Sequence, residues 1–337
     1  MNHHNYYSIK FTDDHLSFLD QTKLPLQEIY VTTDDYERIA LAIERLELRG
    51  APLIGIASAF ALALSFKNIT SKHKEHFEKV YKRLSSTRPT AVNLFYCLNK
   101  MKNVFNSITD YSFTYKALID EAKNIYDYEK HCSEKMAEIG SKIFFKKSNV
   151  LTHCNTGALA SAGFGTAFAV IKKAYEEGYV NHVFVDETRP LLQGLRLTTF
   201  ELQKNDIPFT VQTDSMAAVL MQQGKVDLVI TGADRIALNG DTANKIGTYN
   251  LAVLCNFHNI PFYIVAPSTT IDRKIATGSE IEIEYRKSSE ILSVSGTKIA
   301  YENINTFSPA FDVTPSHLIR GIITEDGLFF FPYNFIR

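Results

Sequence analysis

The chain has 337 residues, of which 45% are hydrophobic, so it can bury a substantial core in one large domain or two smaller ones. Its 36 Lys and Arg residues balance its 37 Asp and Glu residues, which argues against bulk attraction to nucleic acid or to an anionic membrane surface. The four cysteines form no CxxC pair, and the first seven residues lack the pattern of a signal peptide. We therefore expect a cytoplasmic protein with reduced thiols and without a membrane span.

Helical patterns dominate the first part of the chain. Apolar residues recur at helical spacing, and Asp34 and Asp35 can cap the first helix. Pro52 interrupts this pattern, and a second break lies at residues 87–90. The expected helices span residues 34–49, 54–66, 67–84, 91–108 and 115–139. We expect a mainly helical N-terminal domain over residues 1–143.

Short apolar strands alternate with helical patterns in the rest of the chain, which is typical of a parallel sheet built by right-handed crossovers. No G-x-G-x-x-G follows a strand, and the two glycines around Phe164 fall inside a helix pattern. We predict an α/β, Rossmann-like domain over residues 144–337 that does not bind a nicotinamide cofactor. Its expected strands are residues 150–152, 182–185, 209–212, 227–230, 262–265 and 321–324.

Cys154 lies where the first of these strands ends. A small-residue helix pattern over residues 158–172 follows it, so we expect the thiol to face the positive end of a helix dipole. Such a position favours the thiolate, which works as a base or a nucleophile. The alternative is an inert buried cysteine.

Asp234 occupies a second position of this kind, just after the strand predicted at residues 227–230. Ligands collect at the carboxyl ends of parallel strands, so a carboxyl group and a thiol placed there can face one cavity. Their roles would be those of a proton donor and a proton acceptor. The alternative for Asp234 is a turn or helix-capping residue.

Several polar loops fall where such a sheet would display them. Arg49 precedes Gly50 and a helix start, where backbone N–H groups and a guanidinium can hold a phosphate, and Arg88 is a second candidate. Gln193 can hydrogen-bond sugar hydroxyls. For each arginine a salt bridge is the alternative.

Other polar residues allow two interpretations. Asp186 and Glu187 can be caps or salt-bridge partners. Asn244 and Lys245 can bind ligand oxygens, or belong to a turn over residues 239–247 that leads into a helix.

Some candidates favour a structural role. His153 adjoins Cys154, but neighbours on a strand point to opposite faces, so we expect no Cys–His dyad from these two. The remaining cysteines lie in apolar patterns and are predicted to be core residues: Cys97, Cys132 and Cys255. Asp241 either orients the site or caps the next helix.

These motifs together resemble the methylthioribose-1-phosphate isomerases of methionine salvage. Their wider family includes the regulatory subunits of initiation factor 2B and the ribose-1,5-bisphosphate isomerases. The matching motifs run nearly end to end, and in this order they are highly specific. They occupy residues 20–25, 49–52, 87–94, 152–157, 187–190, 193–194, 232–236, 239–241, 244–248 and 309–315.

The resemblance implies roles position by position. Cys154 matches the catalytic cysteine and Asp234 the catalytic aspartate, described as a proton donor. The positions that match substrate-binding residues are Arg49, Gly50, Ala51, Arg88, Gln193, Asn244 and Lys245. The resemblance implies a homodimer that acts on a sugar phosphate with no metal and no organic cofactor.

Two departures from the family pattern bear on substrate preference. Ser215 stands where the isomerases usually have Asn, and residues 306–308 replace an expected Arg-Asn pair. One alternative is therefore an isomerase of a related sugar, 5-deoxyribose 1-phosphate or ribose 1,5-bisphosphate. The other is a non-catalytic regulatory subunit of an initiation-factor-like assembly, although such a subunit has no need for the Cys154 and Asp234 pair.

Overall fold

The computed structural model describes residues 6–335 and divides the chain into two compact units. The first contains the residues up to Glu134 together with Thr156–Gly165. The second contains Lys135–Asn155 together with the residues from Thr166 onward.

The first unit combines a small sheet with a helical core. Residues 9–33, where the patterns predict no element, form an antiparallel sheet in the order β1-β2-β3. The strands are β1 (Ile9–Thr12), β2 (His15–Leu19) and β3 (Tyr30–Thr33). The helices are α1 (Tyr36–Glu44), α2 (Ala51–Leu64), α3 (His73–Ser85), α4 (Val92–Ser107) and α5 (Thr114–Gly140), which continues into the second unit.

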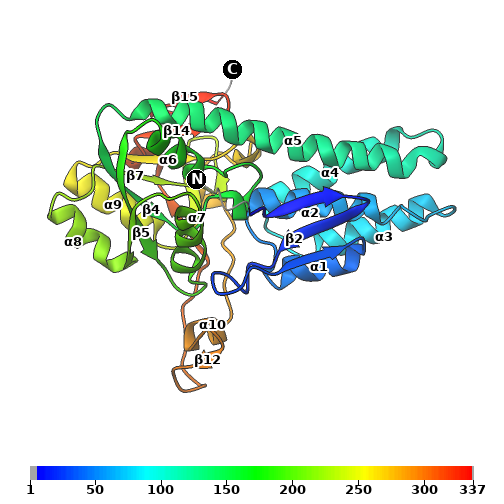
Figure 1. Cartoon of the computed structure of the whole chain (residues 1–337), viewed down its shortest axis with the longest axis horizontal. Coiled ribbons are helices and arrows are strands. Elements are labelled where there is room, and N and C mark those ends of the chain that lie inside the picture. Colours follow the sequence, from blue (N-terminus) through cyan, green and yellow to red (C-terminus); the bar gives the residue numbers. More distant parts are fainter. Residues whose placement is uncertain (1–5, 336–337) are drawn as a thin grey trace. The chain divides into compact units, whose positions relative to one another are not determined.

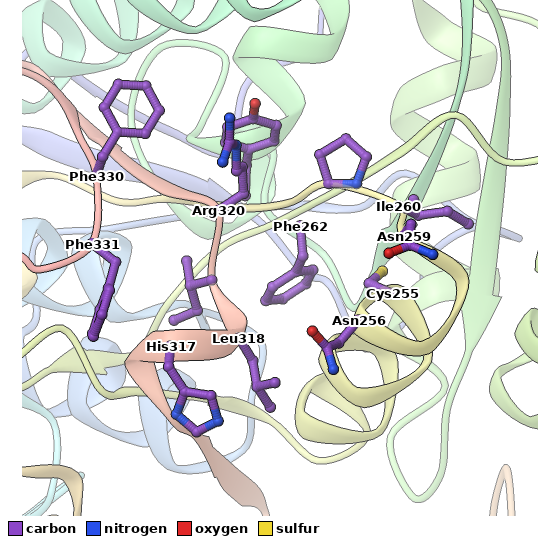
Figure 2. Close-up of a pocket in the computed structure, with 13 residues that line it drawn as sticks. Cys255, Asn256, Asn259, Ile260, Phe262, His317, Leu318, Arg320, Phe330 and Phe331 are labelled. Carbon is purple, nitrogen blue, oxygen red and sulfur yellow. The ribbon is translucent and has the colours of Figure 1, made fainter.

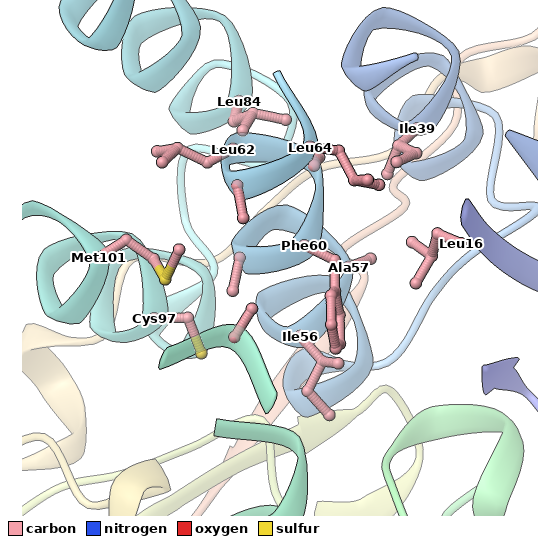
Figure 3. Packing of buried hydrophobic residues seen from close by; sticks show 14 of the residues in the cluster. Leu16, Ile39, Ile56, Ala57, Phe60, Leu62, Leu64, Leu84, Cys97 and Met101 are labelled. Carbon is pink, nitrogen blue, oxygen red and sulfur yellow. The ribbon is translucent and has the colours of Figure 1, made fainter. Parts of the chain in front are cut away.

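Helix α2 forms the centre of this core. Its residues from Pro52 to Leu64 are all buried, because small and aliphatic side chains cover every face of the helix. Figure 3 shows Phe60 of α2 between Leu16 of β2 and Met101 of α4. Pro52 does not interrupt a helix as the pattern suggested. It lies in the first turn of α2, where its missing N–H removes no helical hydrogen bond.

The second unit is built around a seven-stranded sheet in the order β15-β14-β10-β7-β4-β5-β6 (Figure 1). All neighbouring strands are parallel except β15, which pairs antiparallel with β14 at one edge. The strands are β4 (Ser148–His153), β5 (Val180–Glu187), β6 (Phe209–Thr213), β7 (Leu228–Thr231), β10 (Phe262–Val265), β14 (Gly321–Thr324) and β15 (Gly327–Phe329). The six predicted strands and the α/β fold class are confirmed.

The second unit also contains several shorter elements. A three-stranded antiparallel sheet contains β8 (Arg235–Ile236), β9 (Thr242–Lys245) and β13 (Phe311–Thr314), and a hairpin contains β11 (Ser293–Val294) and β12 (Thr297–Lys298). The helices are α6 (Ala167–Glu176), α7 (Thr199–Lys204), α8 (Ala217–Gln222), α9 (Thr248–His258) and α10 (Ser288–Leu292). A π-helical turn covers Gly194–Thr198.

The structure corrects two local predictions. The helix predicted at residues 158–172 is mostly absent, because Gly163 and Gly165 take positive φ angles of 62° and 86° and α6 begins only at Ala167. The turn predicted at residues 239–247 contains strand β9, which pairs with β13 on one side and β8 on the other.

Within residues 6–335, no helix is both long and apolar enough to cross a membrane. In the same range, no group of three or more His, Cys, Asp or Glu side chains is arranged to hold a metal ion. All four cysteines are free and buried, as predicted for the three outside the candidate site.

Candidate functional site

Three neighbouring strands of the second unit deliver the candidate catalytic residues to one edge of the sheet. Strands β7, β4 and β5 are consecutive in the strand order, and all three are parallel. Cys154 follows β4, Asp234 follows β7, and the loop with Gln193 follows β5. These positions lie at the carboxyl ends of the strands, where open α/β sheets bind their ligands.

Cys154 is held in an uncommon conformation. Its φ angle is 62°, in the left-handed region that residues other than glycine rarely adopt. Its Sγ atom donates to Oε1 of Gln193 at 3.4 Å, and its carbonyl oxygen accepts a hydrogen bond from the Thr198 hydroxyl at 2.5 Å. The side chain is buried. The structure therefore brings two of the predicted site residues, Cys154 and Gln193, into contact.

The helix-dipole argument for this thiol is wrong. Helix α6 begins thirteen residues after Cys154, because the intervening segment contains only a single turn of 3-10 helix, Ala158–Ala160. The dipole field is limited to the first turn of a helix. The immediate polar neighbour of the sulfur is the Gln193 amide instead.

A buried ion pair involves His153, the residue before Cys154. Nδ1 of His153 is 3.3 Å from Oδ2 of Asp186, and both side chains are fully buried. Nε2 of His153 lies 2.9 Å from the carbonyl oxygen of Ile246, and Gln212 donates to the other oxygen of Asp186 at 2.9 Å. Both ring nitrogens of His153 are thus engaged away from the thiol, which agrees with the prediction that these neighbours form no dyad.

The pKa values of both members of this pair are raised. A carbonyl oxygen only accepts hydrogen bonds, so Nε2 of His153 must carry a hydrogen. Burial opposes the charged imidazole, but the hydrogen bond and the charge of Asp186 outweigh it and raise the pKa of His153. Burial likewise raises the pKa of Asp186. The sequence offered a weak signal for this pair, since both residues lie at the ends of predicted neighbouring strands.

Strand β9 brings two more predicted residues to the same edge. The backbone N–H of Asp234 donates to the carbonyl of Ala243 at 2.9 Å, so the Asp234 loop lies beside Asn244. The side chain of Asn244 donates to the Thr248 hydroxyl at 3.0 Å. At its other end this segment contacts His153 through Ile246. The segment therefore links the loop after β7 to the end of β4.

Lys245 is buried at the end of β9. Its Nζ donates to the carbonyl oxygen of Ala310 at 3.1 Å and lies 4.5 Å from the ring centroid of Phe311. A buried ammonium needs such partners, because removing it from water is costly.

Asp241 is a structural residue in this arrangement. Its carboxylate accepts hydrogen bonds from Asn239, from the backbone of Gly278 at 3.0 Å and from the backbone of Ser316 at 2.8 Å. Burial opposes the charge, but these hydrogen bonds stabilise the carboxylate and lower the pKa of Asp241. Asp241 therefore connects three loops through hydrogen bonds. It does not cap α9, because the backbone N–H groups of Gly247 and Tyr249 at the start of that helix donate to Asp312.

The remaining predicted residues belong to the first unit. Nε of buried Arg49 donates to Oε1 of Gln21 at 2.9 Å, and Nε2 of Gln21 donates to the carbonyl of Leu159 at 2.6 Å. Gly50 has a φ angle of 97°, and a Cβ atom there would lie 2.4 Å from Cα of Ala160. Only glycine fits this position. The first unit also holds the last two site candidates. Ala51 is the first residue of α2, and Arg88 lies partly buried between α3 and α4.

The second unit also has an open cavity of about 700 Å³, and none of the predicted site residues lines it. Figure 2 shows Cys255, Phe262 and Arg320 among its lining residues. Phe262 begins β10 and Arg320 precedes β14, so the cavity lies at the amino-terminal edge of the sheet. This is the edge opposite to Cys154.

The chain is similar to known proteins both in sequence and in structure. Residues 47–330 match the model of the initiation factor 2 subunit family. Over 330 residues the chain is 50% identical to the methylthioribose-1-phosphate isomerase of Caldicellulosiruptor saccharolyticus, with 96% of each chain covered. It is 47% identical over 333 residues to the methylthioribose-1-phosphate isomerase of Desulfitobacterium hafniense, with 97% of this chain and 96% of that enzyme covered.

Solved structures give the same result. The crystal structure of 5-methylthioribose 1-phosphate isomerase from Pyrococcus horikoshii OT3 superposes with a TM-score of 0.91 at 37% identity, covering 99% of this chain and 97% of that one. The translation initiation factor eIF-2B subunit delta from A. fulgidus superposes with a TM-score of 0.87 at 39% identity, covering 98% of this chain and 97% of that one. The chain therefore belongs to the initiation factor 2 subunit family and groups with its methylthioribose-1-phosphate isomerases.

Proposed function

We propose that this chain converts 5-methylthio-ribose 1-phosphate to 5-methylthio-ribulose 1-phosphate in methionine salvage. The observation that carries the proposal is its 50% identity, over 96% of both chains, to a relative named for this activity. The retained Cys154 and Asp234, at the carboxyl ends of adjacent parallel strands, supply the acid–base groups that the chemistry needs.

The anomeric phosphate sets the chemical problem. It blocks ordinary equilibration of the sugar to an open aldehyde, so the enzyme must open the ring. We assign Asp234 as the donor of a proton to the ring oxygen. Cys154 acts at C1 or C2, either as the base that takes the C2 proton or as the group that steers a hydride from C2 to C1. The hydrogen is moved within one molecule, so no external oxidant or reductant enters the balance, and the family resemblance implies no metal or organic cofactor.

Substrate-binding residues are assigned from the family motif and from their chemistry. In the second unit, Gln193, Asn244 and Lys245 offer two amides and an ammonium to hydroxyl and phosphate oxygens. In the first unit, Arg49, Gly50, Ala51 and Arg88 are assigned as ligands of the sugar phosphate from the family motif. We regard residues 1–143 as the N-terminal domain and residues 144–337 as the catalytic domain.

Oligomeric state and compartment form part of the proposal. We propose a homodimer, which size-exclusion chromatography with light scattering tests directly. We place it in the cytosol, which agrees with four free cysteines.

A specific observation supports one alternative function. The similarity to a protein named as an initiation factor subunit, at 39% identity, keeps a non-catalytic regulatory role as the alternative. Copurification in a large hetero-complex, with no isomerase activity, would support that role.

An assay of the purified protein tests the proposal. The substrates are the 1-phosphates of 5-methylthio-ribose and 5-deoxyribose, and ribose 1,5-bisphosphate. We expect the methylthio sugar to give the highest kcat/KM. Cys154→Ser and Asp234→Asn should each reduce kcat by about 10³-fold, as expected for the loss of an acid–base group. Cys255→Ala, which removes a buried cysteine at the opposite sheet edge, is the matched control and should retain kcat. Near-normal turnover in a folded Cys154 or Asp234 variant would remove that residue from the mechanism.

A further inference from the structure

Glu187, the last residue of β5, has one carboxylate oxygen that the fold leaves unsatisfied. Its Oε2 atom accepts a hydrogen bond from the backbone N–H of Leu195 at 2.6 Å. Its Oε1 atom is buried and has no hydrogen-bond partner among residues 6–335. An unsatisfied buried oxygen of this kind costs about 1–3 kcal/mol, so such a group in a native fold calls for an explanation. A ligand hydroxyl would supply the missing donor.

The position of Glu187 connects it to the candidate catalytic thiol. The register of β4 and β5 pairs His153 with Asp186, so the residues that follow this last pair are Cys154 and Glu187. Neighbouring strands run about 4.8 Å apart. The loop that leaves Glu187 folds back on it, since a Cβ atom on Gly194 would lie 3.2 Å from Cα of Glu187. That loop carries Gln193 to the Cys154 sulfur.

The surroundings of Glu187 suit a proton acceptor. Burial raises its pKa to about 7, and the charge of Asp214 after β6 acts in the same direction. The Leu195 N–H and the charges of Arg196 and His153 oppose that rise. A carboxylate with this pKa gains and loses a proton near neutral pH, which is the condition for efficient general base catalysis.

The isomerisation must release the proton of the C2 hydroxyl, a step assigned so far to neither Cys154 nor Asp234. In the product, C2 carries a carbonyl, so the hydroxyl on C2 must lose its proton by either route. Asp234 is assigned to the ring oxygen and Cys154 to the carbon atoms, which leaves the C2 hydroxyl without a partner. We propose that Glu187 is a catalytic residue whose free Oε1 accepts the proton of the C2 hydroxyl. This inference rests on the proposed function.

The step balances in the hydride route. Asp234 gives a proton to the ring oxygen, and the bond from that oxygen to C1 breaks. A hydride moves from C2 to C1 with its electron pair. The O–H bond on C2 breaks, its electrons form the C2 carbonyl, and its proton passes to the Glu187 carboxylate. Asp234 ends deprotonated and Glu187 protonated, and exchange with solvent restores both.

The enolate route needs the same acceptor. The Cys154 thiolate takes the C2 proton and returns it to C1, and the electrons of that C–H bond form the C1–C2 double bond in between. The proton of the C2 hydroxyl again leaves to Glu187 as the carbonyl forms. Glu187 therefore has one role under both routes.

The test is the pH dependence of kcat/KM, which reports ionisations of the free enzyme, with Glu187→Gln. For the wild type we expect kcat/KM to rise with pH on the acid side of its profile, with an apparent pKa near 7, because the carboxylate must be ionised to act. Glu187→Gln should lower kcat by about 10²-fold, leave KM within about threefold and lose this limb. Glu187→Asp, which restores the carboxylate, should recover part of kcat together with the limb.

Glu325→Gln is the matched control. Glu325 also follows a parallel strand of this sheet, and it accepts a hydrogen bond from the backbone N–H of Ser268 at 2.8 Å. Unlike in Glu187, the second carboxylate oxygen has a partner, because it accepts a hydrogen bond from the Ser268 hydroxyl. We expect wild-type kcat and an unchanged limb.

The outcomes separate the two proposals. Wild-type protein inactive on all three sugars overturns the proposed function and this inference with it. Active wild-type protein with Glu187→Gln at full kcat, or with the limb retained, overturns the inference alone. Should Glu187→Gln not fold, a wild-type profile without a limb near pH 7, or a Glu187→Asp variant with unchanged kcat, would also overturn it.

Discussion

The two edges of the seven-stranded sheet differ in what they do with polar groups. At the carboxyl edge, the His153–Asp186 pair and one oxygen of Glu187 are buried, and Cys154 adopts a left-handed backbone. At the amino edge, the cavity of about 700 Å³ is open, and Asn256, His317 and Arg320 reach solvent.

This difference shows which edge holds polar groups suited to chemistry. A polar group in water has its hydrogen bonds satisfied and its pKa near normal, so it has little capacity for specific chemistry. A buried group changes its pKa and retains directional bonding capacity for a ligand. The open cavity of about 700 Å³ lies away from the constrained polar groups, which gather at the opposite edge.

Left-handed backbone occurs at both edges, at Cys154 and at Asn259 of the cavity, but asparagine adopts this conformation more readily than most residues. The left-handed conformation of Cys154 costs about 1–2 kcal/mol, which the Thr198–Cys154 hydrogen bond and the packing around it must offset. Strain of this size is commonly found at functional positions.

Removing the carboxylate of Asp186 should give the largest difference in stability between the edges. In Asp186→Ala, His153 loses its buried counter-ion, so we expect the free energy of unfolding to fall by about 4 kcal/mol. Asp227→Ala is the comparison at the amino edge, where the carboxylate faces the exposed Lys146 at 2.8 Å, and should cost about 1 kcal/mol. Chemical denaturation followed by circular dichroism measures both. Equal losses would show that the two edges do not differ in this respect.

Sequence patterns predicted the frame of this comparison well. Buried parallel strands read as continuous apolar runs, and all six predicted strands of the sheet are present, with 262–265 and 321–324 matching the observed bounds. The placement of Cys154, Asp234 and Gln193 after three of them follows from that frame alone. Their arrival at one sheet edge is a property of the parallel topology.

What the patterns missed depends on contacts between distant segments. The alanine-rich stretch after Cys154 has a helical composition, but the close approach of Gly165 to the backbone of Thr156, where a Cβ atom would lie at 2.2 Å, is not visible in a local pattern. Strand β9 forms because β13, almost seventy residues later, supplies its partners. Glu187 appears in the motifs without a role, since only the structure shows that one of its oxygens lacks a donor.

A pair of glycines sharpens the contrast between constrained and open positions. Gly50→Ala places a Cβ atom 2.4 Å from Cα of Ala160 at a φ angle of 97°, so we expect a loss of about 3 kcal/mol from conformational strain and overlap together. Gly178→Ala has a similar φ angle of 81° with open space around the new atom, and should cost about 1 kcal/mol from conformation alone. Unfolding free energies of the two variants isolate the overlap. A loss at Gly50 no greater than at Gly178 would mean that the backbone of Ala160 moves aside freely.

A pH dependence of stability provides an independent check on the carboxyl edge. The pKa of Glu187 is raised from its ordinary 4.5 to about 7, so between these values the folded protein holds a proton that the unfolded chain has lost. The folded state then binds more protons, and stability falls as the pH rises through this window. We expect the wild type to lose stability from pH 4.5 to 7 more steeply than Glu187→Gln, with parallel curves above pH 8. Burial also raises the pKa of Asp186 and Asp312, but both remain in the variant, so the difference reports Glu187. Identical slopes would place the pKa of Glu187 near its ordinary value.

The smallest effect is expected at the amino edge. Arg320 is exposed, lines the open cavity and precedes β14 at the end of the strand remote from Cys154. Arg320→Ala should change the free energy of unfolding by no more than about 0.5 kcal/mol, as for surface substitutions in general, and should leave kcat and KM unchanged. Steady-state kinetics on the methylthio sugar measures this against the wild type. A tenfold rise in KM would mean that the cavity takes part in substrate binding, and the division of labour between the two edges would then be wrong.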